Sequence, residues 1–490
     1  MLLSRLFEGA PDVEIDALMA DSRVKLANSI FFCIKGMVND GHKFIQQAKD
    51  NGAIVIVHSD DIKDYDPGLI YIRVVNVLDT LNAVASRFYN DCTHKMTMFG
   101  VTGTNGKSTI TTVIRNLLNH FEPCGYIGTI GIFYGNEIKD ALLTTPDIVP
   151  LHSTLHDMYE AGMKSVAMEV SSAGLDMHRC DSIDFDYAIY TNLTHDHLDL
   201  HGTMENYYEA KEKLFTLLKP NKTAIINIDD EYSDRFIQAT KANVVTYGVD
   251  KEATYRATNI QLTVKSTKFT LVYDHVEYAV ETNLVAKFNV YNLLASIAAL
   301  HEYGVSIEDI LTHVNNLPQV LGRMERIDEG QPFTVIVDYA HTPDGFIKIY
   351  EYAKSITDEG KRLITVFGSA GNRDARKRIE FGKLSDEYCD LIILTEEDPR
   401  TESAEDIANE IRKGIEHTAC VFIESRYDAI RQAIEVANVN DTVVILGKGD
   451  ENYLSYEFGK TEWMGDHIAA KDAIHKYYFG ESEENVYENE

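Results

Sequence analysis

The chain has 490 residues, of which 44% are hydrophobic and 25% are charged, and its formal net charge is −31 at pH 7. One hydrophobic core rarely supports so long a chain, so we expect several domains. The negative field argues against nucleic acid or an anionic membrane as a partner, and no run approaches the roughly 18 apolar residues of a membrane span.

The first predicted domain covers residues 1–94 and is a small α/β unit. Short β-like runs occur at 29–34, 53–57 and 69–74, and a helical stretch from 42 to 51 lies between two of them. Runs of β-branched and aromatic residues separated by helical patterns are typical of alternating strands and helices.

The second predicted domain covers residues 95–318. It opens with a strand at 96–101, a Gly-rich turn, and a helix whose apolar residues recur at helical spacing. Buried strands are predicted at 165–170, 187–190 and 223–228. Strands that alternate with helices imply a mainly parallel, doubly wound sheet.

The third predicted domain covers residues 319–490 and alternates again. Its predicted strands are 333–337, 363–367, 391–394 and 442–446, and helical segments follow most of them. This pattern predicts a Rossmann-like domain. The expected fold class is therefore α/β in three domains, with a central P-loop sheet and a C-terminal Rossmann-like unit. The acidic residues 481–490 are expected to form a solubilising tail.

The turn after the first strand of the second domain has the sequence Gly-Val-Thr-Gly-Thr-Asn-Gly-Lys-Ser at 100–108. Glycines let backbone N–H groups approach phosphate oxygens, and a helix N-terminus favours anions. Lys107 would bridge the outer phosphates and Ser108 or Thr109 would hold Mg²⁺. The strict motif would have glycine where this chain has Val101. The expected nucleotide contacts here are Gly103, Thr104, Asn105, Gly106, Lys107, Ser108 and Thr109.

Polar residues also follow two later strands of this domain. Glu169 closes one strand, and His197 ends the polar run that follows the next. Functional groups gather beyond the carboxyl ends of strands in doubly wound sheets, and a carboxylate with an imidazole could complete a Mg²⁺ site. Lys211 lies in an amphipathic helical stretch and, taken alone, is interpreted as a solvated surface lysine.

Further motifs occur in order along the whole chain. They are Asp-Ser-Arg at 21–23, Thr-Thr-Pro-Asp at 144–147, Glu-Val-Ser-Ser at 169–172, Asn-Leu-Thr-His-Asp-His-Leu-Asp-Leu-His-Gly at 192–202, Phe-Asn-Val-Tyr-Asn at 288–292, Gly-Arg-Met-Glu at 322–325, Asp-Tyr-Ala-His-Thr-Pro-Asp at 338–344, Gly-Asn-Arg-Asp at 371–374, Asp-Pro-Arg at 398–400 and Gly-Lys-Gly-Asp-Glu at 447–451. With the phosphate loop and Lys211, this set resembles the Mur ligases, the cytoplasmic enzymes that build the peptide of peptidoglycan precursors. It is most similar to the members that add a diamino acid to UDP-N-acetylmuramoyl-L-alanyl-D-glutamate.

The resemblance implies an ATP-dependent ligase with ATP and Mg²⁺ as cofactors. ATP would phosphorylate the terminal carboxylate of the UDP-linked dipeptide, an amine would attack the acyl phosphate, and the tetrahedral intermediate would expel phosphate. The partners are then the UDP-muramoyl-dipeptide and a diamino acid, in a cytoplasmic protein that we expect to be monomeric. The scattered cysteines, which form no Cys-x-x-Cys pair, fit a reducing compartment, and the N-terminus does not resemble a secretion signal.

The resemblance also implies residue roles. Ser22 would contact the uridine, in a pocket closed by residues 36–42. The residues matched to dipeptide binding are Thr144, Thr145, Ser171 and Arg179. The matched metal ligands are Ser108, Glu169, His197 and Lys211, the last carbamylated by CO₂ so that a cation becomes an anion. The nucleotide contacts shared between the second and third domains would be Asn289, Asn292, Arg323 and Asp338. The expected catalytic residues are Lys107, His197 and carbamylated Lys211.

In the third domain, Arg373 matches an arginine that binds the α-carboxylate of the incoming amino acid. The positions that recognise the far end of its side chain are Asp398, Arg400, Gly447 and Glu451. Family members that add meso-diaminopimelate typically carry Asp-Asn-Pro-Arg, whereas this chain has Glu-Asp-Pro-Arg at 397–400. A carboxylate at 398 favours a bare ammonium, while Arg400 favours a second carboxylate. We expect L-lysine, with meso-diaminopimelate as the alternative.

Three other functions are possible alternatives. Another ligase of the superfamily, such as a folylpolyglutamate synthase or a different Mur ligase, would not explain the N-terminal block or the motif at 397–400. A P-loop kinase would not explain the motif set of the third domain. A non-catalytic paralogue that binds the precursor as a regulator would not need Lys107, Glu169, His197 and Lys211 intact. One departure from the family pattern is Ala173, where the usual residue is His.

Overall fold

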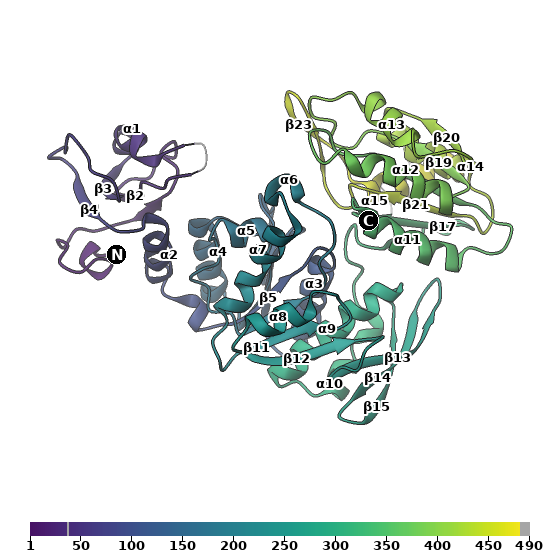
Figure 1. Ribbon diagram of the computed structural model, residues 1–490, viewed down its shortest axis with the longest axis horizontal. Helices are drawn as coiled ribbons and strands as arrows, with labels where there is room; N and C mark the ends of the chain where they lie inside the picture. The colour runs from purple at the N-terminus through teal and green to yellow at the C-terminus, as the bar shows by residue number, and fades with distance from the viewer. Residues whose placement is uncertain (37–38, 481–490) are drawn as a thin grey trace.

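The computed structural model describes residues 1–36 and 39–480, and three main sheets divide this part of the chain (Figure 1). The acidic tail at 481–490 lies outside the described residues. The N-terminal unit has a parallel sheet in the order β1-β2-β3-β4, with strands β1(Ala17–Met19), β2(Ser29–Phe32), β3(Ala53–His58) and β4(Ile70–Arg73). Helices α1(Ile45–Asp50) and α2(Val77–Phe88) contribute apolar side chains to its two small cores.

The middle unit is built on an eleven-stranded sheet in the order β15-β14-β13-β12-β11-β10-β5-β9-β6-β7-β8. Its parallel part consists of β5(Thr97–Thr102), β6(Cys124–Gly128), β9(Ser165–Glu169), β10(Tyr187–Tyr190), β11(Thr223–Asn227), β12(Asn243–Gly248) and β13(Tyr255–Leu262). Antiparallel strands extend both edges, namely β7(Gly131–Tyr134) and β8(Glu137–Lys139) at one edge and β14(Thr267–Tyr273) and β15(Val276–Thr282) at the other.

Helices cover both faces of this sheet because alternate residues of each strand point to opposite sides. In β5, Phe99 and Val101 join the core under α3(Lys107–Leu118), α9(Lys287–Tyr303) and α10(Ile307–Leu311). Met98, which directly precedes Phe99, joins the opposite core under α4(Ile148–Glu160), α5(Ser172–Asp176), α7(Met204–Leu217) and α8(Ser233–Ala239). The short α6(Leu198–His201) lies outside these layers, in the loop after β10.

The C-terminal unit has a six-stranded sheet in the order β16-β17-β21-β18-β19-β20. Only β16(Glu325–Ile327) is antiparallel to its neighbour within this sheet, and the parallel strands are β17(Thr334–Asp338), β18(Leu363–Phe367), β19(Leu391–Leu394), β20(Ala419–Phe422) and β21(Thr442–Leu446). One face is covered by α11(Pro343–Ile356), α12(Arg376–Tyr388) and α13(Ala404–Arg412), and the other by α14(Arg426–Val436) and α15(Asp466–Ala473). A hairpin of β22(Tyr453–Tyr456) and β23(Gly459–Glu462) follows β21.

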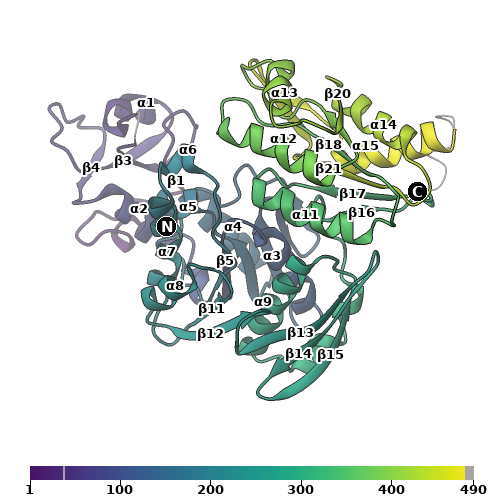
Figure 2. The ribbon, with the colours of Figure 1, turned by 45° about the vertical axis from the view of Figure 1, so that its right-hand side comes forward.

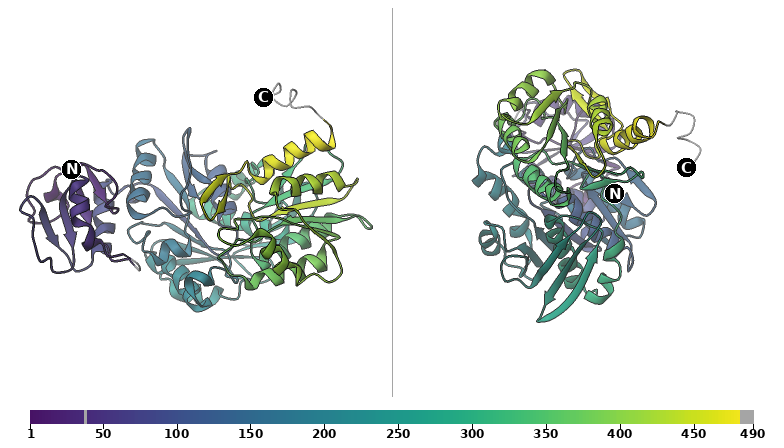
Figure 3. Two further views of the ribbon diagram at one scale, coloured as in Figure 1. Left: turned by 90° about the horizontal axis from the view of Figure 1, so that it is seen from above. Right: turned by 90° about the vertical axis from the view of Figure 1, so that its right-hand side faces the viewer.

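The N-terminal and C-terminal units lie at opposite ends of the middle unit (Figures 1 and 3). Helix α2 packs against α4, and Ile148 of α4 belongs to the N-terminal core. At the other end, α11 lies on the side of the C-terminal unit that faces α9 (Figure 2), and Val285 and Ala286 of the middle unit belong to the C-terminal core. No helix among the described residues has the length and apolar character needed to cross a membrane.

The expected α/β fold class is confirmed, with its central doubly wound sheet and its Rossmann-like C-terminal unit. The antiparallel edges at β7–β8 and β14–β15 were not predicted. The domain limits at 94/95 and 318/319 stay predictions, and they fall between the three sheets.

Candidate active site

The turn between β5 and α3 requires glycine at two positions. Gly103 has φ +150° and Gly106 has φ +91°, a region that L side chains rarely adopt. A Cβ on Gly103 would lie 1.8 Å from Thr191 Oγ1, and one on Gly106 would lie 2.5 Å from Asn292 Oδ1. The loop therefore packs tightly against the end of β10 and the start of α9, and its geometry presents the N-terminus of α3 to an anion.

Two lysine ammonium groups meet at this loop. Lys107 Nζ donates to the carbonyl oxygens of Gly103 and Thr104, both at 2.9 Å. Lys211 Nζ donates to the same Gly103 oxygen at 2.8 Å, and the residue is 1% exposed. Burial lowers the pKa of both amines, and that of Lys211 falls well below its usual range. The interpretation of Lys211 as a solvated surface lysine is therefore wrong, because α7 turns it toward the phosphate loop.

A cavity of about 970 Å³ lies in front of the loop, between the middle and C-terminal units. It brings together most of the predicted site residues: Thr104, Asn105, Gly106, Lys107, Ser108, Thr109, Thr144, Glu169, Ser171, Arg179, His197, Lys211, Asn289, Asn292, Arg323 and Asp338. Predicted site residues that do not line it are Ser22, Gly103, Thr145, Arg373, Asp398, Arg400, Gly447 and Glu451.

The carboxylate of Glu169 is fixed at the end of β9. Its Oε1 accepts from Tyr126 Oη at 2.6 Å and from the backbone N–H of Thr129 at 2.9 Å, and its Oε2 accepts from Thr129 Oγ1 at 3.2 Å. The Ser108 hydroxyl and the His197 ring line the same cavity. A fixed carboxylate, a hydroxyl and an imidazole form an oxygen-rich donor set that suits Mg²⁺. The residues therefore fit the metal that the resemblance implies.

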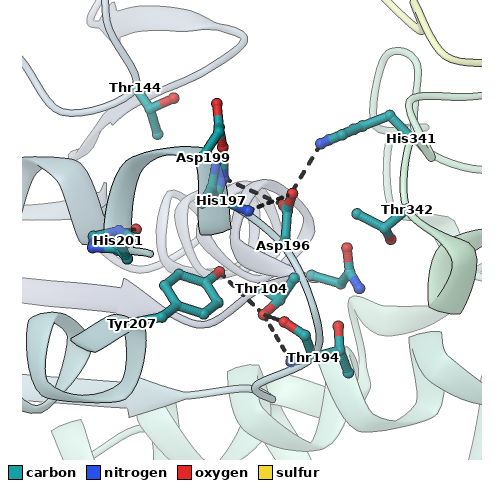
Figure 4. A network of polar contacts seen from close by, with 12 residues as sticks. Thr104, Thr144, Thr194, Asp196, His197, Asp199, His201, Tyr207, His341 and Thr342 are labelled. Carbon is teal, nitrogen blue, oxygen red and sulfur yellow. Dashed lines mark hydrogen bonds and ion pairs between the residues drawn. The ribbon is translucent and has the colours of Figure 1, made fainter. Parts of the chain in front are cut away.

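The loop that carries His197 also reaches the C-terminal unit (Figure 4). The Asp196 carboxylate lies 3.3 Å from His197 Nε2 and 3.7 Å from His341 Nε2. Burial by itself would raise the pKa of Asp196, but the two imidazoles lower it below its usual range. The same loop is bonded to the phosphate loop, where Thr104 Oγ1 accepts from the Thr194 N–H at 3.0 Å. Sequence analysis missed Asp196 and His341 as site residues, although both lie inside the motifs at 192–202 and 338–344.

The C-terminal unit brings a cation to the phosphate side of the cavity. The Arg323 guanidinium lies over the Tyr339 ring, 4.2 Å from its centroid, and 3.3 Å from the Asp450 carboxylate. Arg323 is close enough to lower the pKa of Lys107, and Glu169 is close enough to raise it, although burial is the larger effect. The two units touch directly where Asn105 Nδ2 donates to Asp344 Oδ2 at 3.0 Å.

The other predicted nucleotide contacts are held in place within each unit. Asn289 Nδ2 donates to the carbonyl oxygen of Val285 and Asn292 Nδ2 donates to Asn289 Oδ1, both at 2.8 Å. The Asp338 carboxylate accepts from the backbone N–H groups of Met324 and Ala340, both at 2.7 Å.

The predicted dipeptide-binding residues divide into two groups. Thr144, Ser171 and Arg179 line the cavity, and Arg179 pairs with Asp147 at 2.7 Å. Thr145 instead is 1% exposed, and its hydroxyl donates to the Glu169 carbonyl oxygen at 2.9 Å. Its side chain supports the end of β9.

The predicted uridine contact lies in the N-terminal unit. Ser22 is 7% exposed, and its hydroxyl donates to Gln47 Oε1 at 2.7 Å. Residues 37 and 38 of the segment expected to close the uridine pocket lie outside the described residues.

The residues predicted to bind the amino acid lie in the C-terminal unit. Arg373 Nη1 donates to Asp199 Oδ2 of α6 at 2.7 Å, so this arginine also bridges the two units. The others gather in what we call the distal cluster, which consists of Glu397, Asp398, Arg400, Gly447, Lys448 and Glu451. Within it, Lys448 Nζ donates to Asp398 Oδ1 at 2.9 Å and to Glu451 Oε2. Sequence analysis did not single out Lys448, although it lies within the motif at 447–451.

Two family descriptions match the chain. Residues 101–300 match the Mur ligase middle domain, and residues 322–449 match the Mur ligase, glutamate ligase domain.

Named relatives span almost the whole chain. A UDP-N-acetylmuramoyl-L-alanyl-D-glutamate–2,6-diaminopimelate ligase of Caldanaerobacter subterraneus subsp. tengcongensis is 38% identical over 452 residues, covering 91% of this chain and 92% of the relative. A ligase of the same name from Geobacillus thermodenitrificans is 40% identical over 458 residues, covering 91% of each chain. A solved structure with that name superposes with a TM-score of 0.69 at 29% identity, covering 97% of this chain and 98% of its own.

Proposed function

Because the chain belongs to the Mur ligase family of ATP-dependent ligases, and within it to the MurE type, we propose that it adds meso-diaminopimelate to UDP-N-acetylmuramoyl-L-alanyl-D-glutamate. The reaction would proceed through an acyl phosphate of the D-glutamyl carboxylate, which converts a poor electrophile into a good one. We propose that it acts as a cytoplasmic monomer. In this proposal residues 1–94 bind the UDP precursor, residues 95–318 bind ATP and residues 319–490 bind the amino acid.

Phosphoryl transfer would take place between the phosphate loop and Arg323. Lys107 and the backbone N–H groups at the start of α3 are positioned for the transferred phosphate, and Arg323 adds a second cation from the facing unit. Ser108, Glu169 and His197 would hold Mg²⁺, which when bound neutralises charge on the phosphates. Asn289, Asn292 and Asp338 would contact the rest of the nucleotide.

The acceptor would lie on the opposite side of the cavity. Thr144, Ser171 and Arg179 face this space, and a guanidinium there suits the anionic dipeptide. Ser22 of the N-terminal unit would contact the uridine. Carbamylated Lys211 would add an anion beside the metal site. The burial of its amine, which forms no ion pair with a carboxylate of residues 1–36 or 39–480, supports this role.

The choice of diaminopimelate rests on the distal cluster. The expectation of L-lysine assumed a free carboxylate at Asp398, but Lys448 already compensates this charge. The Arg400 guanidinium, in contrast, donates to the carbonyl oxygen of Gly371 and pairs with no carboxylate among the described residues. An unpaired guanidinium suits a second carboxylate, which diaminopimelate has and L-lysine lacks. The names of the relatives favour the same amino acid.

A phosphate-release assay with the UDP-muramoyl-dipeptide and ATP tests this proposal. We expect the highest kcat/KM with meso-diaminopimelate, lower values with L-lysine and L-ornithine, and a loss of about 100-fold or more in Lys107→Ala. A higher kcat/KM with L-lysine would overturn the amino acid assignment. Unchanged turnover in Lys107→Ala would overturn the catalytic assignment.

A further inference from the structure

Lys448 is a buried cation at the centre of the distal cluster. It follows β21, between Gly447 and Gly449, and it is 1% exposed. Its ammonium bonds Asp398 Oδ1 at 2.9 Å and Glu451 Oε2, and it lies 4.5 Å from the centroid of the Tyr453 ring. One buried ammonium thus engages two carboxylates, and removing it would leave both without compensation.

Asp398 is held in a single position by this contact. Its Oδ1 also accepts from the Ser455 N–H of the β22–β23 hairpin at 2.9 Å, and its φ is +45°. The same hairpin residue bonds Arg400, whose N–H donates to the Ser455 carbonyl oxygen at 3.0 Å. Lys448 therefore helps to fix the relative position of Asp398 and Arg400 through the hairpin.

Two groups of the cluster form no direct ion pair with a described residue. The Arg400 guanidinium pairs with no carboxylate there, as noted above. The Glu397 side chain is 7% exposed, and it forms no hydrogen bond or ion pair of its own with a described residue. Burial raises its pKa, and nearby cations, of which Arg426 has the largest effect, lower it in part. It lies against Gly447, where a Cβ would come within 2.1 Å of Glu397 Oε2. A guanidinium and a carboxyl group that both lack a direct ion pair, in one cluster, complement the carboxylate and ammonium of an amino acid end.

We propose that Lys448 is a positioning residue that sets the preference for an amino acid with a zwitterionic far end over one with a bare ammonium. This inference rests on the proposed ligase function. Lys448 neutralises Asp398 and holds it away from Arg400, so the guanidinium stays available for the substrate carboxylate. Without Lys448, Asp398 would repel that carboxylate or pair with Arg400 itself, and either change favours an amino acid whose far end carries only an ammonium.

The test compares kcat/KM for meso-diaminopimelate and L-lysine in the wild type, Lys448→Met, Asp398→Asn and the double variant. We expect Lys448→Met to lower the diaminopimelate-to-lysine ratio at least about tenfold. Asp398→Asn added to Lys448→Met should restore most of the ratio, because, of the two carboxylates left uncompensated, it removes the one that we propose acts on Arg400. The KM values for ATP and for the UDP precursor should stay unchanged in all of them.

Lys460→Met is the matched control. Its ammonium lies 3.4 Å from the centroid of the same Tyr453 ring, but it forms no ion pair with the distal cluster. We expect the wild-type ratio in this variant. If Lys448→Met fails to fold, Lys448→Gln keeps a hydrogen-bond donor without the charge and carries the same expectation.

An unchanged ratio in Lys448→Met or Lys448→Gln would overturn the inference, and so would a lowered ratio that Asp398→Asn does not restore. The wild-type preference tests the proposed function separately. A wild type that prefers L-lysine contradicts that function, whereas the effect of Lys448 is measured as a change in the ratio from whatever value the wild type has.

Discussion

Lys107 and Lys211 donate to one carbonyl oxygen, that of Gly103, from opposite sides of the phosphate loop. Two ammonium groups so close repel each other, and the positive charge of Lys107 adds to burial in lowering the pKa of Lys211. Lys211 forms no ion pair with a described carboxylate, and the Asp196 charge, which raises its pKa, is the smallest of the three effects. The lowered pKa makes the neutral amine more accessible than in an exposed lysine, and a neutral amine is the form that reacts with CO₂.

Replacing Lys211 tests its proposed role. We expect Lys211→Ala to lower kcat at least about 100-fold in the phosphate-release assay, with no rescue by added bicarbonate, because no amine remains to be carbamylated. With ¹³C-bicarbonate, the wild type should show a carbamate carbon signal that the variant lacks. Lys213→Ala is the control, since this lysine of the same helix pairs with Asp176 at 3.0 Å near the surface. Wild-type activity in Lys211→Ala would contradict the role.

The sequence could have predicted the burial of Lys211 but not the pairing of Lys448. Tyr207, Lys211 and Leu214 lie at i, i+4 and i+7 on one face of α7, and Tyr207 and Leu214 are fully buried. The amphipathic pattern thus predicts a buried position for Lys211, but the charge of a lysine favoured the interpretation as a surface residue. Lys448 and Asp398 are 50 residues apart and meet only after β19 and β21 are placed in the sheet. Local patterns carry no information on such a contact.

At the scale of secondary structure, the strand-end site was predictable because β5, β9 and β10 are parallel neighbours. Their carboxyl ends share one edge of the sheet, so the phosphate loop, Glu169 and the loop with His197 must lie close together. The antiparallel edges were missed although β14 begins with an alternation of buried and more exposed residues. Alternation identifies a strand, but it does not reveal the partner or the direction of pairing.

A chain of hydrogen bonds joins α4 to the N-terminal unit. His152 of α4 is 2% exposed, and its Nε2 lies 2.7 Å from Ser182 Oγ. Ser182 in turn donates to Asn82 Oδ1 of α2 at 3.0 Å. Burial lowers the pKa of His152 to about 4. The neutral ring is therefore part of this junction, and protonating it places a charge in an apolar site.

Stability should consequently depend on pH through His152. In the unfolded chain the His152 ring binds a proton below about pH 6.5, whereas in the folded chain it does so only near pH 4. The contribution of His152 to folding stability is therefore fully present above about pH 6.5 and is lost as the pH falls toward 4. Between pH 8 and pH 5 we expect His152 to account for a loss of about 2 kcal/mol. His152→Gln should reduce the drop in thermal midpoint over this range, as measured by circular dichroism. An equal drop in both proteins would contradict the prediction.

For the whole molecule, three compositional blocks predicted three α/β units, but their arrangement could not be derived from the sequence. Burial patterns report which face of an element is covered and not which unit covers it. The cavity is closed by a few polar contacts between the middle and C-terminal units: Asn105 with Asp344, Asp196 with His341, and Asp199 with Arg373. Polar contacts that are partly open to solvent each stabilise by roughly 0.2–1 kcal/mol, so these contacts hold the units together weakly.

The protein should therefore open in solution and close on its ligands. We expect the radius of gyration from small-angle X-ray scattering to decrease when a non-hydrolysable ATP analogue and the UDP precursor are added. Asp199→Asn should increase the radius of gyration of the ligand-free protein, because it weakens the contact between Asp199 and Arg373. As a control, Asp176→Asn removes an acid that pairs only within the middle unit. A radius that ligands do not change would contradict this closure.

The hydrophobic cores of both outer units include side chains that the middle unit supplies. Ile148 belongs to one of these cores, and Val285 and Ala286 belong to the other. Unfolding of the middle unit therefore removes buried apolar contacts from the cores of the N-terminal and C-terminal units as well. The three sheets are consequently not three independent thermodynamic units, and the cooperativity of unfolding extends across the boundaries that the chain topology suggests.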